Sequence, residues 1–390
     1  MNKQRLSSLD RQNILAVFDY LHQTPEISCQ EYETARYIKN YLVPLGFVIE
    51  EVVGTGFTAY LKNGEGPVLG LRAELDGLPV VENPSTLSVK RQVISMHQGV
   101  MHACGHDAHM TIVLYTLQYL AQHLDQWHGT VIGIFEEGEE VGAGITEMVD
   151  HCQKFDFDYI YGNHVFNDLP TGTISVTAGP VMAGCGVFDL TLKGRGGHGS
   201  RPDRCINPIG VATEIYTALH QSWPTAFDIE QIVTLAITRL TAGNTMNVIP
   251  DLCRMSGTVR FFEADVGGKA MDLIRSTVDS VAKLRHCQVS YNLLVSDQRA
   301  VINDEWLANL LQEAIMYQLP DVTIVDNKWY ASETFAQYQL LCPTLFTLIG
   351  LKNEKLGTGA EHHNEYFAVD PEAVFIGIEV MILLALRLLN

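Results

Sequence analysis

The chain lacks the features that would assign it to several classes of protein. It has 26 lysines and arginines against 45 aspartates and glutamates, so its formal net charge is −19 and no basic surplus can neutralise phosphates. This argues against nucleic acids and acidic membranes as partners. Met1–Asn13 lacks the apolar core of a signal peptide. The longest apolar stretch, Val374–Leu389, contains Glu379 and Arg387 and is shorter than the ~20 residues of a membrane span, so we expect a buried terminal helix there.

Paired cysteine spacings are also missing. The eight cysteines are scattered along 390 residues, a length that folds without disulfides. We therefore predict a reduced, cytoplasmic protein in which Cys104 stays available as a thiolate. The chain is too long for one ordinary core, so two domains are expected.

Residues 1–177 and 294–390 alternate between helical and strand patterns, which predicts an α/β catalytic domain with a mixed, largely parallel sheet. In such a sheet, functional residues gather in loops at the carboxyl ends of strands. The expected helices are Asp10–His22, Glu31–Leu42 and Ala108–Leu124, and the expected strands are Val48–Val53, Thr58–Lys62, Val68–Arg72, Thr130–Phe135 and Tyr159–Val165.

Residues 178–293 follow a different order, β-α-β-β-α-β, which is that of a ferredoxin-like α+β domain. The helix–strand pattern resumes afterwards, so we predict that this domain is inserted into the first. Its expected strands are Gly186–Lys193, Ile232–Leu240, Arg254–Arg260 and Gln288–Leu294, and its expected helices are Pro208–Gln221 and Gly268–Lys283.

The densest cluster of metal-ligand residue types lies between Met101 and His109, where three histidines, a cysteine and an aspartate occupy nine residues. In extended backbone, His102, Cys104 and His106 point the same way, which suits a transition metal. The alternative is a polar loop with a buried thiol, since free cysteine is often buried.

Four glutamates follow the expected strand Thr130–Phe135, in the run Glu136-Glu137-Gly138-Glu139-Glu140. They repel one another unless cations or solvent offset the charge. A solvated acidic loop is the alternative, but the position at a strand end favours a site. Glu139 and Glu140 can then divide two tasks, metal binding and proton transfer.

Two further histidine positions fall between elements: His164, at the end of an expected strand, and His362-His363, before the final helix. A lone histidine after a strand is more often structural than a ligand. Together with the cysteine and glutamates, however, these residues exceed what one tetrahedral zinc site takes, and they indicate two metal ions with open positions for water.

The run Gly194-Arg195-Gly196-Gly197-His198-Gly199 fits the dinucleotide-binding pattern only formally. The following Ser200-Arg201-Pro202-Asp203 does not open an apolar helix, as that fold requires. We expect instead a glycine-rich turn that presents His198.

Taken together, the motifs resemble the M20 metallopeptidase family, in its amidohydrolase branch of aminoacylases, hippurate hydrolases, indole-acetyl-amino-acid hydrolases and N-acetyldiaminopimelate deacetylases. The segment His102–His109 is close to identical with that branch's H-A-C-G-H-D-x-H. The other matching segments are His22–Ser28, Arg72–Pro79, His164–Ile174, Gly194–His198, Asn247–Asp251 and Gly257–Arg260.

The resemblance implies a dinuclear metal site, with Zn, Mn, Co or Ni as candidate ions. It implies that Glu139 is the general base and that Asp76 orients the ligands. It also implies that His198 approaches the substrate carbonyl, often from the other subunit of a homodimer formed through the inserted domain. The implied ligands are Cys104, His106, Glu140, His164 and His363, and the implied substrate-binding residues are Asn247 and Arg260.

The chain departs from the usual pattern of this branch at four places. Glu74 replaces an aspartate, and Glu136-Glu137-Gly138 replaces Q-P-A. Thr334 stands where S-E-D-F has its aspartate, and the residues after His198 also differ. None of these changes removes an implied ligand or the base, whereas those near His198 and Thr334 bear on substrate preference.

The sequence thus predicts a hydrolase of linear amide bonds that cleaves N-acyl amino acids, for example N-acetyl amino acids. A dinuclear dipeptidase or carboxypeptidase is the nearest alternative. A non-catalytic metal-stabilised sensor is a third hypothesis, but such a protein would have lost the base, and Glu139-Glu140 is intact.

Overall fold

The computed structural model describes residues 7–390. The segment Met1–Asn13, for which no signal peptide is predicted, therefore lies partly outside the described residues. The chain folds into two compact units. The first unit contains the described residues up to Gly179, together with Ile302–Lys328 and Gln337–Asn390. The second contains Pro180–Val301 and Trp329–Ala336.

An eight-stranded sheet forms the centre of the first unit, in the order β1-β2-β4-β3-β5-β16-β6-β15. The four central strands β4, β3, β5 and β16 run parallel to one another, and antiparallel pairs lie to both sides of them. This confirms the expected mixed, largely parallel sheet. The strands are β1 (Val48–Val53), β2 (Gly56–Asn63), β3 (Val68–Glu74), β4 (Gly129–Glu136), β5 (Tyr159–Pro170), β6 (Thr173–Ser175), β15 (Thr323–Val325) and β16 (Thr344–Lys352).

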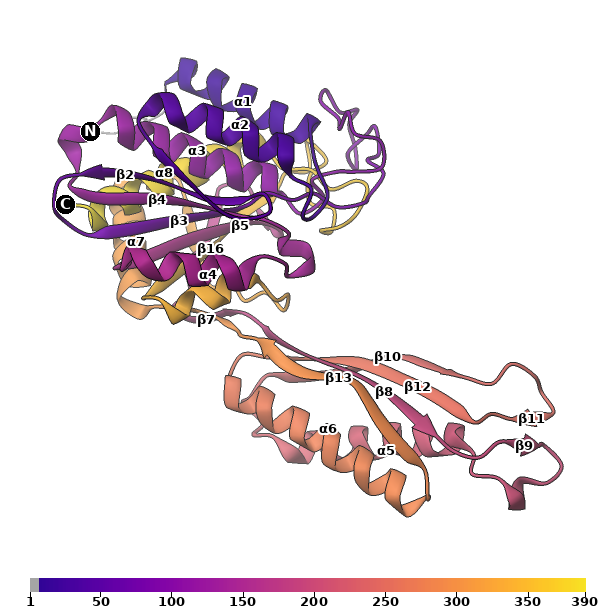
Figure 1. Cartoon of the computed structure of the whole chain (residues 1–390). Coiled ribbons are helices and arrows are strands. Elements are labelled where there is room, and N and C mark those ends of the chain that lie inside the picture. The colour runs from indigo at the N-terminus through magenta and orange to yellow at the C-terminus, as the bar shows by residue number, and fades with distance from the viewer. Residues whose placement is uncertain (1–6) are drawn as a thin grey trace. The chain divides into compact units, whose positions relative to one another are not determined.

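Helices cover both faces of this sheet, with α1, α2 and α3 together on one side and α4 on the other (Figure 1). Buried runs such as Val131–Phe135 in β4 explain why central strands read as nearly continuous apolar sequence. The helices of the unit are α1 (Ser8–Gln23), α2 (Tyr32–Leu42), α3 (His106–Gln122), α4 (Ile145–Cys152), α7 (Glu305–Gln318) and α8 (Pro371–Leu388). Shorter 3-10 turns are η1 (Val43–Leu45), η2 (Leu124–Gln126), η3 (Glu139–Val141), η4 (Gln153–Phe155) and η6 (Thr334–Leu340).

The terminal helix α8 is buried along most of its length, as expected. Asp370 caps its first turn by accepting a hydrogen bond from Glu372 N, and Pro371 occupies the first helical position. α8 packs against α3, which is itself buried from His106 to Leu117. None of the helices within residues 7–390 is long and apolar enough to cross a membrane.

The second unit has its own sheet and its own core. Its strands β8 (Gly184–Lys193), β10 (Val233–Ala242), β12 (Leu252–Phe261) and β13 (Gln288–Gln298) pair antiparallel in the order β10-β12-β8-β13. α5 (Pro208–Ala226) and α6 (Ala264–Leu284) lie along the sheet, and alternate residues of β12 such as Cys253, Met255 and Val259 are buried in the core between them (Figure 1). The order is ferredoxin-like.

The unit begins at Pro180, close to the start predicted at residue 178, and continues to Val301, beyond the end predicted at residue 293. β13 continues to Gln298, where it still pairs with β8 at Cys185, and the polar sequence after Leu294 gave no strand signal. Residues 329–336 also belong to it, because Ala183 N donates to the carbonyls of Trp329 and Ala331. The remaining short elements are β7 (Gly179–Met182), β9 (Gly197–His198), η5 (Pro202–Arg204), β11 (Val248–Ile249) and β14 (Val301–Asn303).

Candidate metal centre

Three parallel strands of the first unit carry residues toward one edge of its sheet. β3 leads to Asp76, β4 leads into the turn η3 with Glu139 and Glu140, and β5 carries His164. The first turn of α3 brings His106 to the same edge, where its ring bonds to Asp76. This is the position at which parallel sheets form their sites.

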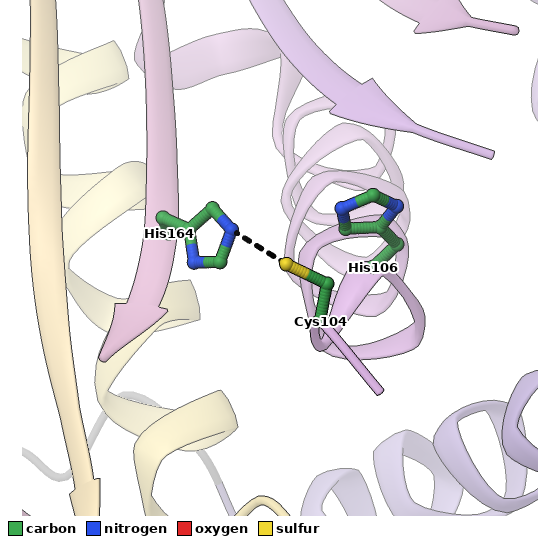
Figure 2. Close-up of side chains that lie close together, drawn as sticks. All are labelled: Cys104, His106 and His164. Carbon is green, nitrogen blue, oxygen red and sulfur yellow. Dashed lines mark hydrogen bonds between the residues drawn. The ribbon is translucent and has the colours of Figure 1, made fainter. Parts of the chain in front are cut away.

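Cys104, His106 and His164 form a buried group whose sulfur and nitrogen atoms all lie within 4.8 Å of one another. Figure 2 shows Cys104 and His164 facing each other, and Cys104 Sγ lies 3.4 Å from His164 Nε2. Three neighbouring groups satisfy the same 4.8 Å limit. They are Cys104 with Glu140 and His363, His106 with Glu139 and Glu140, and Glu74 with His106 and His109. The structure thus brings together all five implied ligands and the implied base.

The hydrogen bonds of the histidine rings leave one nitrogen of each aimed at this centre. His106 Nδ1 lies 2.8 Å from the carbonyl and 3.1 Å from Oδ1 of Asp76. His164 Nδ1 lies 2.7 Å from the carbonyl of Val165. Each Nδ1 therefore donates its proton to an oxygen acceptor and Nε2 faces the centre, as in metal-bound histidines; in His164 this Nε2 lies 3.4 Å from Cys104 Sγ.

Glu140 lies between two of these rings. Its Oε1 is 3.8 Å from His106 Nε2, and its Oε2 is 3.4 Å from His363 Nε2. Its backbone N donates to Asp76 Oδ2, which also accepts the hydroxyl of Ser28 at 2.7 Å. Asp76 therefore orients a candidate ligand from α3 and another from η3.

The charges of the centre fit a pair of divalent cations. Burial raises the pKa of the Cys104 thiol well above its usual value, and the neighbouring Glu140 raises it further. Burial acts against ionisation of Asp76, but its hydrogen bond to His106 lowers the pKa of that carboxyl below its usual value. Buried nitrogen, sulfur and carboxylate donors at one place are the donor set of a zinc-type site, and bound cations favour the thiolate.

His363 and its neighbour His362 have different surroundings. His363 is held in the left-handed region at φ 64°, its amide donates to the carbonyl of Ala103, and its ring is 54% exposed. His362 packs its ring 4.8 Å from that of Phe367, and burial lowers its pKa to about 3. His362 Nδ1 also lies 3.8 Å from Cys104 Sγ, so both histidines lie near the centre, and His363 as the ligand stays a prediction.

His164 differs in position from the expectation. It lies within β5, opposite Leu348 of β16, and not in a loop after the strand. The Gly-Asn-His sequence resembles a strand end, and β3 does pair with β5 only as far as Tyr161, but β16 continues to pair with β5 as far as Pro170. β5 is long because its far half pairs with β16 alone.

The other histidines of the 102–109 segment have different surroundings, although His109 lies in a candidate group with Glu74 and His106. His109 Nδ1 lies 2.9 Å from Glu74 Oε2, and its Nε2 accepts the amide of Val165 at 3.0 Å. Both nitrogens of His102 are buried without a hydrogen-bond partner among residues 7–390, and burial lowers its pKa to about 4. Asp107 instead binds His22 at 2.7 Å.

His198, Asn247 and Arg260 all lie in the second unit. His198 is exposed in the short strand β9, paired with Val248 of β11, and is not in an irregular turn. Its Nδ1 accepts from the amide of Ser200 at 3.2 Å and lies 2.8 Å from the Ser200 hydroxyl. Asn247 accepts the amide of Gly199 through its carbonyl, and Arg260 Nη1 donates to Ser332 Oγ at 2.9 Å.

Sequence reasoning missed that the glutamates at the end of β4 and after it have separate partners. Glu136 accepts from Arg72 at 2.9 Å and from the Tyr338 hydroxyl at 3.0 Å, and it is fully buried. Glu137 points to Thr55 in the turn between β1 and β2. Carboxylates that are neighbours in the sequence therefore point to different partners. The departure from the family pattern at these positions was the only feature of the sequence that indicated this.

The family model that describes peptidase family M20/M25/M40 matches residues 70–387, and the chain belongs to this family. The chain is 30% identical over 384 residues to thermostable carboxypeptidase 2 of Saccharolobus solfataricus, covering 97% of this chain and 95% of the relative. It is 32% identical over 373 residues to N-acetylcysteine deacetylase of Bacillus subtilis, covering 95% of each.

Among solved structures, the Bacillus subtilis YXEP protein, a dinuclear metal binding peptidase of family M20, superposes with a TM-score of 0.84 at 30% identity. The alignment covers 98% of this chain and 99% of that one. These similarities show a metal-dependent hydrolase that acts on amide bonds.

Proposed function

We propose that the chain is an N-acyl-amino-acid amidohydrolase that releases a carboxylate and a free amino acid. The observation that carries this proposal is the position of Glu139, whose carboxylate lies within 4.8 Å of the donor atoms of His106 and Glu140. A carboxylate beside a metal-type centre can serve as a general base, since proton transfer needs reach first and pKa second.

Bound at the centre, two divalent ions would polarise the amide carbonyl and lower the pKa of water toward ~7. Cys104, His106, His164, Glu140 and His363 would hold them. We propose that Glu139 accepts the proton of the attacking water and later delivers it to the leaving amine. Asp76 keeps His106 and Glu140 in place through its two carboxylate oxygens.

His198 is proposed to donate a hydrogen bond to the oxyanion that forms on the substrate. Because its Nδ1 accepts from Ser200, the neutral ring carries its proton on Nε2, which is the form that a donor requires. Losing one such donor typically costs ~10²–10³ in rate. Asn247 and Arg260 are proposed to bind the substrate, Arg260 through a carboxylate, which matches a guanidinium in geometry.

A carboxypeptidase or dipeptidase is the second candidate, and it is favoured by the relationship to a carboxypeptidase over nearly the whole chain. We also propose a cytoplasmic homodimer joined through the second unit, in which β10 is an edge strand with Leu240 exposed. Light scattering on the purified protein would test the homodimer.

Turnover measurements on the metal-reconstituted protein test the proposal. A panel of N-acetyl and longer N-acyl amino acids is compared with dipeptides of the same carboxyl-terminal residue. We expect kcat/KM for the best N-acyl substrate to exceed that of the matched dipeptide by at least about tenfold, a transition-state difference of about 1.4 kcal/mol. The reverse preference would establish the peptidase instead.

A further inference from the structure

Two carboxyl groups that the proposed mechanism does not use lie buried behind the turn that carries Glu139. Glu31, before α2, is 0% exposed, and Glu137, after β4, is 5% exposed. Both contact Thr55: its Oγ1 lies 2.6 Å from Glu31 Oε2 and 3.0 Å from Glu137 Oε2. The amide of Thr55 also donates to Glu137 Oε2 at 2.7 Å.

The other oxygen of Glu31 ties two backbone segments together. Glu31 Oε1 accepts the amides of Cys29 and Gly138, each at 2.9 Å. Cys29 follows Ser28, whose hydroxyl binds Asp76, and Gly138 precedes the turn η3. Glu31 therefore connects the segment that holds Asp76 to the segment that carries the proposed base.

The number of protons available indicates the protonation state of the Glu31 and Glu137 carboxyls. The Thr55 hydroxyl has one hydrogen but reaches two carboxyl oxygens, so one of its contacts needs a proton from the carboxyl side. Among residues 7–390, neither carboxyl forms an ion pair with a lysine, arginine or histidine that could offset two negative charges. If Glu31 Oε2 donates to Thr55 Oγ1 and Thr55 Oγ1 donates to Glu137 Oε2, each of these two contacts has one donor and one acceptor.

The side chain of Glu137 lies in a slot left by two glycines. A Cβ on Gly54 would lie 2.1 Å from Glu137 Oε2, and a Cβ on Gly144 would lie 2.7 Å from Glu137 Cγ. Both glycines have positive φ, at 50° and 74°. The chain has glutamate where the family pattern has proline, and the backbone around it leaves the room that this side chain requires.

We propose that Glu31, Thr55 and Glu137 are positioning residues for the amidohydrolase reaction: a proton held on Glu31 lets both carboxyls bind Thr55 and fixes the turn that presents Glu139 and Glu140. The inference rests on the proposed function, because it takes Glu139 as the base. A turn fixed at both sides keeps the base within reach of its proton, and a misplacement of about 1 Å can cost ~10²-fold in rate.

The direction of the pKa shift of Glu31 is toward the protonated form. Burial raises the pKa of this carboxyl, its hydrogen bonds to Thr55 and to backbone amides act in the opposite direction, and the negative charge of Asp76 raises it further. The other groups facing it are Glu137 and the Cys29 thiol, whose own pKa is raised by burial and by these carboxyls. On α2, Lys39 and Arg36 are paired with Glu51 and Glu33.

Substitution by glutamine tests the proton directly, because the amide of Gln has a carbonyl for Cys29 and Gly138 and an N–H for Thr55. We expect Glu31→Gln to keep kcat within about threefold of wild type, while Glu31→Ala loses at least about tenfold at unchanged metal content. Thr55→Ser, which keeps the hydroxyl, should likewise be active where Thr55→Val is not. A Glu31→Gln variant as impaired as Glu31→Ala would overturn the proposal.

Infrared spectroscopy of the metal-loaded protein gives a readout that needs no substrate. The wild-type minus Glu31→Gln difference spectrum at neutral pH should contain the C=O band of a protonated carboxyl. Absence of that band would show Glu31 to be ionised and would refute the proposal. Failure of the wild-type protein to cleave N-acyl amino acids would refute the proposed function alone, and turnover of the variants would then be measured with the dipeptide substrate.

Discussion

The hydrogen bonds of each histidine ring determine which of its nitrogens faces the metal centre. His106 and His164 use Nδ1 for an oxygen acceptor and keep Nε2 for the centre, whereas His109 uses both nitrogens within the protein. A sequence motif that contains all of these residue types cannot separate them. The ligand set came from resemblance to a family, and only the folded chain shows the bonds that distinguish ligand from support.

Cys104 gives the most direct residue-scale prediction. Cys104→Ser replaces a soft thiolate by a hydroxyl that stays protonated, so the protein should bind less than its full complement of metal and lose most of its turnover. Elemental analysis after dialysis measures the metal content. Cys342→Ser, at a thiol that is in none of the candidate metal groups found among residues 7–390, is the matched control and should keep full occupancy. Full occupancy in Cys104→Ser would contradict the ligand role.

The contacts of His22 with two carboxylates should make the free energy of unfolding depend on pH. Burial disfavours its charge, but hydrogen bonds to Asp107 and Glu82 raise its pKa to about 10. A raised pKa means that the stabilisation is fully present below the ordinary value of 6.5 and is lost as the pH rises through about 10. His22→Gln should therefore lower the free energy of unfolding by about 3–5 kcal/mol at pH 7 and by progressively less toward pH 10.

Urea unfolding at a series of pH values measures this difference. His128→Gln, at an exposed histidine, is the control and should change little at any pH. A His22→Gln penalty that stays constant from pH 7 to pH 11 would contradict the assignment.

Among the elements, the apolar runs of β3 and β4 made these strands predictable, because both faces of a central parallel strand are buried. The end of β13 and the full length of β5 were not predictable, since polar residues there stay paired by neighbours distant in sequence. The same reason hides the contact between Glu31 and Gly138, which lie 107 residues apart. The topology of the fold determines such partners, and the local sequence pattern does not indicate them.

We predict that His109 lets α3 hold the strands β3 and β5 in place. It accepts the amide of Val165 in β5 and binds Glu74 at the end of β3, so His109→Leu leaves a buried donor and a buried carboxylate without this partner. We expect a loss of at least about 2 kcal/mol in the free energy of unfolding. Because Val165 follows His164, metal affinity should fall as well.

Denaturant unfolding and metal titration measure these two effects. Met110→Leu, a nearly volume-conserving change at the next position of the same helix, should cost less than about 1.5 kcal/mol and leave metal affinity unchanged. Equal behaviour of the two variants would show that His109 has no positioning role.

At the scale of the whole molecule, the two units have separate hydrophobic cores, and all the candidate ligands lie in the first. A bound ion stabilises only the unit that folds around it, by about 2.7 kcal/mol when its concentration is 100 times its Kd. Chelation should therefore lower the unfolding temperature of the first unit and leave that of the second unchanged.

Calorimetry with and without chelator makes this comparison. Leu219→Ala, in the core of the second unit, identifies that unit's transition by lowering it. The prediction fails if chelator leaves both transitions unmoved or moves the one that Leu219→Ala marks.

Glu139 is proposed to move the proton while other residues hold the metal, and one variant tests both roles. Glu139→Gln keeps the size of the side chain but removes its basic oxygen. We predict full metal content by elemental analysis, together with a kcat reduced to less than about a hundredth of wild type, since general base catalysis contributes ~10²–10⁴-fold. Retention of more than about a tenth of the wild-type rate at full metal occupancy would contradict the account.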